Sequence, residues 1–375
     1  MKLPKKIDIA PELLFRLRST YNGSIEVHIE KTGYTKEEIL LWEKTGKEVP
    51  SKIIKHYQAE YKKPIAFFLL PDLPLGKLKP QKLRTHKNIP QKDFTKDTVL
   101  GVEKISQRIE LLEDLGLLSD NTIEFDKFEF DSNPKKYAST IRAFLSIDSA
   151  ASKTKNWLKY WVDHLEKAGV FISQTSLQDK LSGFLFTSKS GNTTIVLDIG
   201  EPQTRRLFTL AHELGHFLLA RKKRGFSYEA EERYCNSFAG SLLVPKSILV
   251  ESSEIKRYLG NDLLDGDLLA FAKSYGISPE MALRRLLDEK ISPQIDSDFY
   301  DSWIKRYEGK GGDYKKSTGG GPLTYYYGVY NEVGHKVSKL LFKARSEGLI
   351  DTPTFVSQTG LRSKNIKKFS GVALT

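Results

Sequence analysis

The sequence contains a single cysteine, Cys235, in 375 residues, so no intrachain disulfide can form. This absence excludes the disulfide-stapled secreted domains and favours a reducing compartment. Long apolar runs are missing too: the best one, AFFLL at 66–70, is cut off by Pro71 and is far shorter than the roughly 20 residues of a membrane span. The basic N-terminus has no apolar stretch behind it, so no signal peptide is predicted. We therefore expect a cytoplasmic protein with no membrane contact.

Acidic residues are fewer than basic ones, 47 against 59, and the resulting net charge of +12 is distributed unevenly along the chain. Residues 1–100 carry +8 and residues 301–375 carry +7, whereas the middle of the chain carries −3. Basic ends around a near-neutral middle indicate that any contact with a polyanion belongs to the ends. Lysines that only keep the protein soluble explain the same pattern, so both interpretations stay open.

Periodicity predicts an α+β protein that is mostly helical. Short helices fill the first 70 residues, a long amphipathic helix covers about 95–115, and helix is expected again at 140–168. The segments VFIS, GFLF and TTIVLDI then alternate with period two, which indicates strands. The predicted organisation is a helix-turn-helix domain, a linker, a main domain, a glycine-rich linker and a C-terminal helical region, at residues 1–75, 76–94, 95–300, 301–324 and 325–375.

The N-terminal segment has the pattern of a helix-turn-helix motif. Ser24 is placed to cap a first helix that ends at Gly33, and Thr35 caps a second, with Glu38 at the capping-box spacing. The second helix is expected to present an apolar face formed by Ile39, Leu40 and Trp42. Base edges would then face Tyr34, Thr35, Lys36, Glu37 and Glu38, and phosphates would face Lys31, Lys44, Lys47, Lys52 and Lys55. The two carboxylates disfavour DNA, so protein docking is an equal alternative.

The segment FTLAHELGHFLLA at 208–220 places three ionisable groups in an otherwise apolar helix. His212 and His216 are one turn apart, so their imidazoles can converge on one zinc ion. Glu213 lies next to the first of them, at the general-base position of a metallopeptidase. Burial of these groups without a metal or close partners would cost several kcal/mol. The sequence therefore predicts a zinc site.

Zinc normally takes a third protein ligand together with water. No suitably spaced third histidine follows, but the segment SYEAEERYCNSFAGSLLVP is rich in carboxylates. Helical periodicity narrows the choice to Glu231 or Glu232 and does not decide between them. Cys235 lies beside the same stripe, where a small buried apolar residue is the better interpretation of a cysteine than a ligand.

The run RRLFTLAHELGHFLL, followed by E-x-x-C-N-x-F-A from Glu232 and by LLVP, resembles the ImmA/IrrE family of zinc metallopeptidases. WVDHLEKAGVFI, GFLF and TTIVLDI fit the same family, and the N-terminal segment resembles the Xre-like helix-turn-helix domain often fused to it. The likeness covers most of residues 20–300. Two departures are small: Asp198 stands where the family usually has Asn, and Cys235 replaces a common Ala.

The resemblance implies a zincin-like peptidase domain with a small sheet and an HExxH helix. It also implies a third ligand at Glu232, a Zn²⁺ cofactor held with His212 and His216, and Glu213 as the catalytic base. Family members of known role cleave a transcriptional repressor, so an Xre-type repressor is the expected protein substrate. The strand at 194–199 is positioned to pair with an extended substrate. An oxyanion donor is also expected; Tyr228 and Tyr234 are candidates, although packing is the better interpretation of each.

Two alternatives remain. One is a DNA-binding regulator or antitoxin-like protein whose metal site is vestigial or structural, although such a site has no need of Glu213. The other is a protease held inactive until the basic C-terminal region receives a signal.

Overall fold

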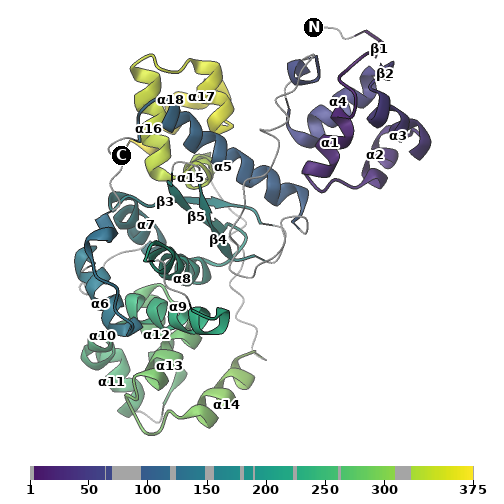
Figure 1. The fold of residues 1–375 in the computed structure, drawn as a ribbon. Helices are drawn as coiled ribbons and strands as arrows, with labels where there is room; N and C mark the ends of the chain where they lie inside the picture. Colours follow the sequence, from purple (N-terminus) through teal and green to yellow (C-terminus); the bar gives the residue numbers. More distant parts are fainter. Residues whose placement is uncertain are drawn as a thin grey trace. The chain divides into compact units, whose positions relative to one another are not determined.

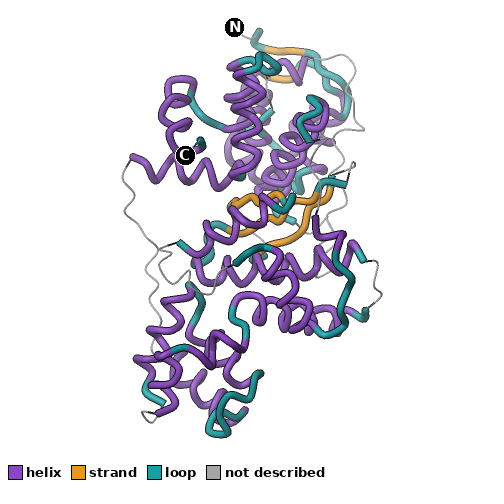
Figure 2. Tube along the Cα trace, turned by 90° about the vertical axis from the view of Figure 1, so that its left-hand side faces the viewer, coloured by secondary structure: helices purple, strands orange, loops and turns teal. Residues whose placement is uncertain are grey.

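The computed structural model describes residues 4–63, 65–69, 94–118, 124–147, 156–177, 181–188, 191–222, 226–260, 263–308 and 322–374. The prediction of a mostly helical α+β protein is confirmed, because helices dominate this part of the chain and the strands form two small sheets (Figure 2). Most of the expected linker at 76–94 and of the glycine-rich segment at 301–324 lies outside the described residues. Over the described ranges no helix combines the length and apolarity needed to cross a bilayer.

The chain forms two compact units. The first comprises residues 1–106 with 178–180, and the second comprises the rest, so the division falls within α5 (Lys96–Asp114). The helical stripe predicted for this helix is confirmed, because its apolar residues Val99, Val102, Ile105, Ile109 and Leu112 are all buried.

The first unit contains a short two-stranded sheet and a helical bundle; its elements are β1 (Lys6–Ile7), α1 (Leu13–Thr20), α2 (Ile25–Thr32), α3 (Lys36–Thr45), β2 (Val49–Pro50) and α4 (Ser51–Tyr61). The predicted caps are present: the Ser24 hydroxyl accepts from the Glu26 N–H, Gly33 ends α2 in the left-handed region, and Thr35 and Glu38 form a capping box. These caps fix the two helices and the turn between them.

The buried face of α3 differs from the expected one. Ile39 is buried as predicted, but Leu40 is 41% exposed, and the buried position one turn after Ile39 is taken by Glu43. Glu43 is stabilised there by a bidentate ion pair with Arg18, at 2.7 and 2.8 Å, and by the Tyr57 hydroxyl at 2.8 Å. Three hydrogen bonds thus stabilise a buried carboxylate at a position where an apolar side chain was expected. Hydropathy alone cannot predict this, because it treats every carboxylate as exposed.

The second unit is built around a three-stranded sheet of β3 (Phe171–Thr175), β4 (Gly183–Thr187) and β5 (Thr193–Asp198) in the order β3-β5-β4. β5 pairs in parallel with β3 and antiparallel with β4. The expectation that the strand at 194–199 pairs with a substrate is therefore wrong, since both of its edges are already used. The Ser173 hydroxyl of β3 donates to the Glu332 carbonyl at 2.6 Å, which ties this strand to the C-terminal region. β3 and β4 are therefore the two edge strands of this sheet.

Helices cover both faces of this sheet (Figure 1). On one face, Ile172, Leu185, Ile195 and Leu197 share a core with α8 (Gln203–Arg221), α9 (Tyr228–Leu243) and α7 (Trp157–Lys167). Phe171 points the other way, into a second core with α5 and the C-terminal helices. The alternation of neighbouring side chains along β3 thus joins two cores through one strand. Further helices extend the first core: α6 (Pro134–Phe144), α10 (Lys246–Glu251), α11 (Ser253–Gly260), α12 (Asp265–Tyr275), α13 (Pro279–Asp288) and α14 (Ser297–Glu308).

The C-terminal region consists of α15 (Pro322–Val333), α16 (His335–Ser346), α17 (Thr352–Thr359) and α18 (Ile366–Ala373). Gly334, which has a φ of 94°, separates α15 from α16. A Cβ at Gly334 would lie 2.6 Å from the Ile172 carbonyl oxygen, so the break lets the chain approach β3 closely. Buried Arg108 of α5 donates to the carbonyls of Glu332 and Gln358, which ties α5 to this region.

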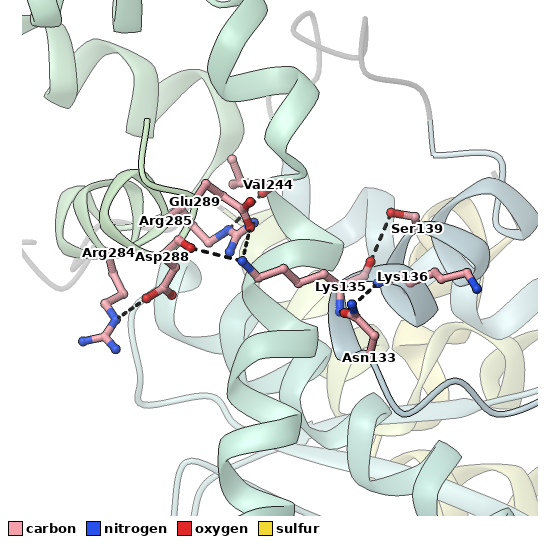
Figure 3. Close-up of polar contacts among 9 residues, drawn as sticks. All are labelled: Asn133, Lys135, Lys136, Ser139, Val244, Arg284, Arg285, Asp288 and Glu289. Atoms are coloured by element: carbon pink, nitrogen blue, oxygen red, sulfur yellow. Dashed lines mark hydrogen bonds and ion pairs between the residues drawn. The ribbon is translucent and has the colours of Figure 1, made fainter. Parts of the chain in front are cut away.

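The C-terminal end of α9 is held by polar contacts from α6 and α13. Arg285 donates to the Val244 carbonyl at 3.0 Å and to Glu289 at 2.8 Å, and Lys135 reaches the same carboxylate at 2.9 Å (Figure 3). Arg142 of α6 donates to the Leu242 carbonyl at 2.6 Å. Two buried guanidinium groups therefore satisfy the last carbonyls of α9, which have no partner within the helix.

Candidate metal centre

The residues singled out by sequence lie on two packed helices. His212, Glu213 and His216 belong to α8, and Glu232 belongs to α9, the helix packed along it. The approach of the two helices depends on Gly215 inside the HELGH segment. A Cβ there would lie 3.2 Å from the Cys235 sulfur and 3.3 Å from the Phe238 ring, closer than a side chain normally allows. Glycine at this position lets α9 come near enough to present its carboxylates to the histidines.

Three donor atoms converge between these helices. The Nε2 atoms of His212 and His216 are 3.0 Å apart, and oxygens of Glu232 lie 3.5 and 3.4 Å from them. This trio forms the one potential metal-ligand cluster of three or more His, Cys, Asp or Glu side chains in the described part of the chain.

The separations of these atoms can be compared with those around a metal ion. Two ligand atoms that each lie about 2.05 Å from a tetrahedral zinc ion are about 3.3 Å apart. The two imidazole Nε2 atoms, 3.0 Å apart, lie close to that value, and each is 3.4 to 3.5 Å from one of the two Glu232 oxygens. Two neutral imidazoles and one carboxylate also form a donor set that suits zinc and leaves a fourth position open. The residues present therefore fit a single divalent ion.

Glu213 is 3% exposed and follows directly after His212. It is absent from the converging trio, as expected of a residue that does not bind the metal. Because α8 turns by about 100° per residue, its side chain leaves the helix in a different direction from the two imidazoles.

Glu231 and Glu232 were equally acceptable ligands by periodicity, and the structure separates them. Glu231 contacts the other nitrogen of His216, with 2.7 Å between its carboxylate oxygen and Nδ1, on the ring edge away from the trio. Glu232 faces the Nε2 atoms. Sequence reasoning missed the contact of Glu231 with the far side of the ring. The sequence did contain a sign of this contact. Consecutive residues on α9 point in directions about 100° apart, so two adjacent glutamates can contact the two opposite edges of one imidazole ring.

The structure also distinguishes the surroundings of the other three candidates near the site, two tyrosines and a cysteine. The Tyr234 hydroxyl donates to the Asp131 carbonyl at 2.7 Å and its ring stacks on Phe130, so it is a packing residue. Tyr228 begins α9, is 44% exposed and stands one turn before Glu232. Burial, together with the negative charges of Glu231, Glu232 and Glu213, raises the pKa of the Cys235 thiol and keeps it protonated, which fits the predicted apolar role.

Asp198, one of the departures from the family pattern, has a local structural role. Its carboxylate accepts from the backbone N–H groups of Leu177 and Gly200, at 3.0 and 3.1 Å. These contacts stabilise the turn that leads from β5 into α8, and so they help to fix the start of the histidine helix.

Residues 165–287 match the family described as Peptidase_M78, the IrrE N-terminal-like domain. The matched segment runs from the end of α7 through the three-stranded sheet and both helices of the metal centre to α13. No curated protein matches the chain.

Proposed function

Because residues 165–287 belong to the ImmA/IrrE family of metallopeptidases, we propose that this protein is a zinc-dependent endopeptidase that cleaves a transcriptional repressor. His212, His216 and Glu232 hold the metal, and Glu213 is the catalytic base. The observation that supports this assignment best is that three side chains from two helices converge, with one ligand atom from each within 4.8 Å of the others.

Glu213 moves the proton in this proposal. When bound, the zinc ion polarises the scissile carbonyl and makes a water molecule at the site more acidic. The Glu213 carboxylate takes a proton from that water as the oxygen bonds to the carbonyl carbon. The C–N bond then breaks and Glu213 gives the proton to the departing amine, which leaves a carboxylate and an amine as products. Its burial at 3% exposure keeps bulk water from competing for the proton.

The substrate is expected to bind along β4. An extended peptide can add to a sheet edge through main-chain hydrogen bonds, and β4 is an edge strand of the three-stranded sheet. β4 also packs directly on α8, so a peptide on this edge runs close to the histidine helix. Tyr228 is the better candidate for a donor to the developing oxyanion, since Tyr234 is engaged with Asp131.

A helix-turn-helix repressor encoded beside this chain is the first substrate to test. Co-expression should give one zinc-dependent cut with the wild type. Glu213→Gln should keep one equivalent of zinc but lose cleavage by 10²-fold or more, because the amide cannot accept the proton. Glu229→Gln, a change at an exposed position on α9, is the matched control and should cleave normally. Full activity in Glu213→Gln would remove Glu213 from the mechanism.

A DNA-binding role for the first unit remains a second candidate. The cap geometry of α2 and α3 favours it, because it fixes two short helices around a left-handed glycine turn. The exposed side chains of α3 fit it less well, since they include Glu37, Leu40 and Leu41 beside Lys36 and Lys44. This mixed surface favours docking of a protein. Salt-dependent binding of random duplex DNA by the full chain would support the DNA role, and no binding at low salt would exclude it.

A further inference from the structure

We propose that Glu231 is a positioning residue of the metal centre, which orients His216 and fixes its tautomer for metal binding. The proposal rests on the proposed function only in taking the trio of His212, His216 and Glu232 as the ligands. It assigns to Glu231 no contact with the metal or with the substrate.

Glu231 and Glu232 lie against different nitrogens of the His216 ring. The Glu231 oxygen is 2.7 Å from Nδ1 of His216, whereas Nε2 of the same ring is 3.4 Å from Glu232. A carboxylate can only accept at this distance, so the ring nitrogen must carry the hydrogen. Nδ1 is therefore protonated and Nε2 carries the lone pair that faces the trio.

The contact also determines the orientation of the ring. His216 is 2% exposed within the packed face of α8, and a hydrogen bond at its far edge prevents the imidazole from flipping. The negative charge makes the ring more basic and so a stronger ligand. Carboxylates placed in this way behind metal-bound histidines typically change metal affinity by about 10- to 100-fold when they are removed.

Glu231 cannot replace Glu232 as the ligand while it holds this contact, because it lies against the opposite edge of the imidazole. Its side chain is 33% exposed, and its backbone N–H donates to the Ser227 carbonyl in the first turn of α9. Loss of its carboxylate therefore leaves the helix and the three donors of the trio in place, so its effect can be measured without unfolding the protein.

The test measures metal binding and needs no substrate. Zinc affinity of the full-length chain is determined by competition with a chelator for the wild type, Glu231→Ala, Glu231→Gln, Glu232→Ala and the control Glu229→Gln. Glu231→Ala should bind zinc about 10- to 100-fold more weakly. Glu231→Gln should lose less, because its amide oxygen still accepts from Nδ1–H, and Glu229→Gln should match the wild type.

Two spectroscopic measurements separate positioning from ligation. Cobalt(II) in Glu231→Ala should keep the visible absorption of the wild type, because the ligand set is unchanged, whereas Glu232→Ala should alter it. Nitrogen-15 shifts of the zinc-loaded protein should show His216 protonated at Nδ1, with its hydrogen-bond shift lost only in the Glu231 variants. Circular dichroism of the metal-free proteins serves as the folding control.

Zinc affinity within twofold of the wild type in Glu231→Ala would overturn the proposal. A changed cobalt spectrum in Glu231→Ala with an unchanged one in Glu232→Ala would make Glu231 the ligand and overturn it as well. If the wild type binds zinc as expected but cleaves no repressor, the proposed function fails and the role of Glu231 stands. If the wild type binds no zinc, both fail.

Discussion

Glu166 provides a quantitative test of how the C-terminal helices are attached to α7 and the three-stranded sheet. This glutamate lies near the end of α7, is 5% exposed, and accepts a hydrogen bond at 2.7 Å from the Lys336 N–H at the start of α16. Burial raises the pKa of its carboxyl to about 8, and nearby Asp163 acts in the same direction. Hydrogen bonds from the backbone of Lys336 and Ile172 and the charge of Lys336 lower the pKa and only partly offset these effects.

The raised pKa makes stability depend on pH. In the unfolded chain the carboxyl titrates near its ordinary value of 4.5. Between about pH 4.5 and 8 the folded protein therefore keeps a proton that the unfolded chain releases, so stability is highest below this window and falls across it. The slope is about 1.4 kcal/mol per pH unit, which amounts to about 3 to 4 kcal/mol between pH 5 and pH 8.

Glu166→Gln should remove this contribution, because an amide does not titrate and still offers an oxygen to the Lys336 N–H. Urea unfolding followed by tryptophan fluorescence is a suitable assay, since Trp157 and Trp161 lie on the same helix as Glu166. A chelator keeps metal binding from adding its own pH dependence. Glu347→Gln, at the exposed end of α16, is the control and should keep the slope of the wild type. Parallel curves for the wild type and Glu166→Gln across this range would refute the reasoning.

Two further predictions concern packing in the second unit. Arg285→Leu should lower the free energy of unfolding by about 2–4 kcal/mol, because the Val244 carbonyl and the Glu289 carboxylate each lose a buried donor. Arg284→Leu, which removes an exposed ion pair next to it, should cost less than about 1 kcal/mol in the same urea titration, and equal losses would contradict the assignment. Gly276→Ala should be strongly destabilising, because its φ is 66° and a Cβ would lie 2.6 Å from the Trp157 ring. Gly266→Ala on the same helix meets no atom within 4 Å and should leave the thermal midpoint unchanged or slightly raised; a larger loss there than at position 276 would contradict this account.

Much of the local structure could be predicted from the sequence. The caps at Ser24 and Thr35, the long helix ending before Gly116, and the three strands of the main sheet all follow from short-range rules of capping and periodicity. The same rules are insufficient at positions whose structure depends on a residue far away in the sequence. The division between α15 and α16 at Gly334 was not predicted, because the close approach of the Ile172 carbonyl cannot be seen along the chain. Leu40 was assigned to the core because hydropathy does not reveal that Arg18 and Tyr57 stabilise a buried Glu43.

Sequence by itself determined the chemistry available at the metal centre. A four-residue spacing fixes the separation of His212 and His216 on any α-helix, and the adjacent Glu213 follows from the same geometry. Which edge of His216 faces Glu231 and which faces Glu232 was decided only by tertiary structure, because it depends on how α9 is rotated against α8. The strand order was decided in the same way: the three strands of the main sheet could be found by their alternation, but only pairing across distant segments placed β5 in the centre and β3 and β4 at the edges. Local patterns encode which groups can face one another along a single element, and packing between elements selects which of them meet.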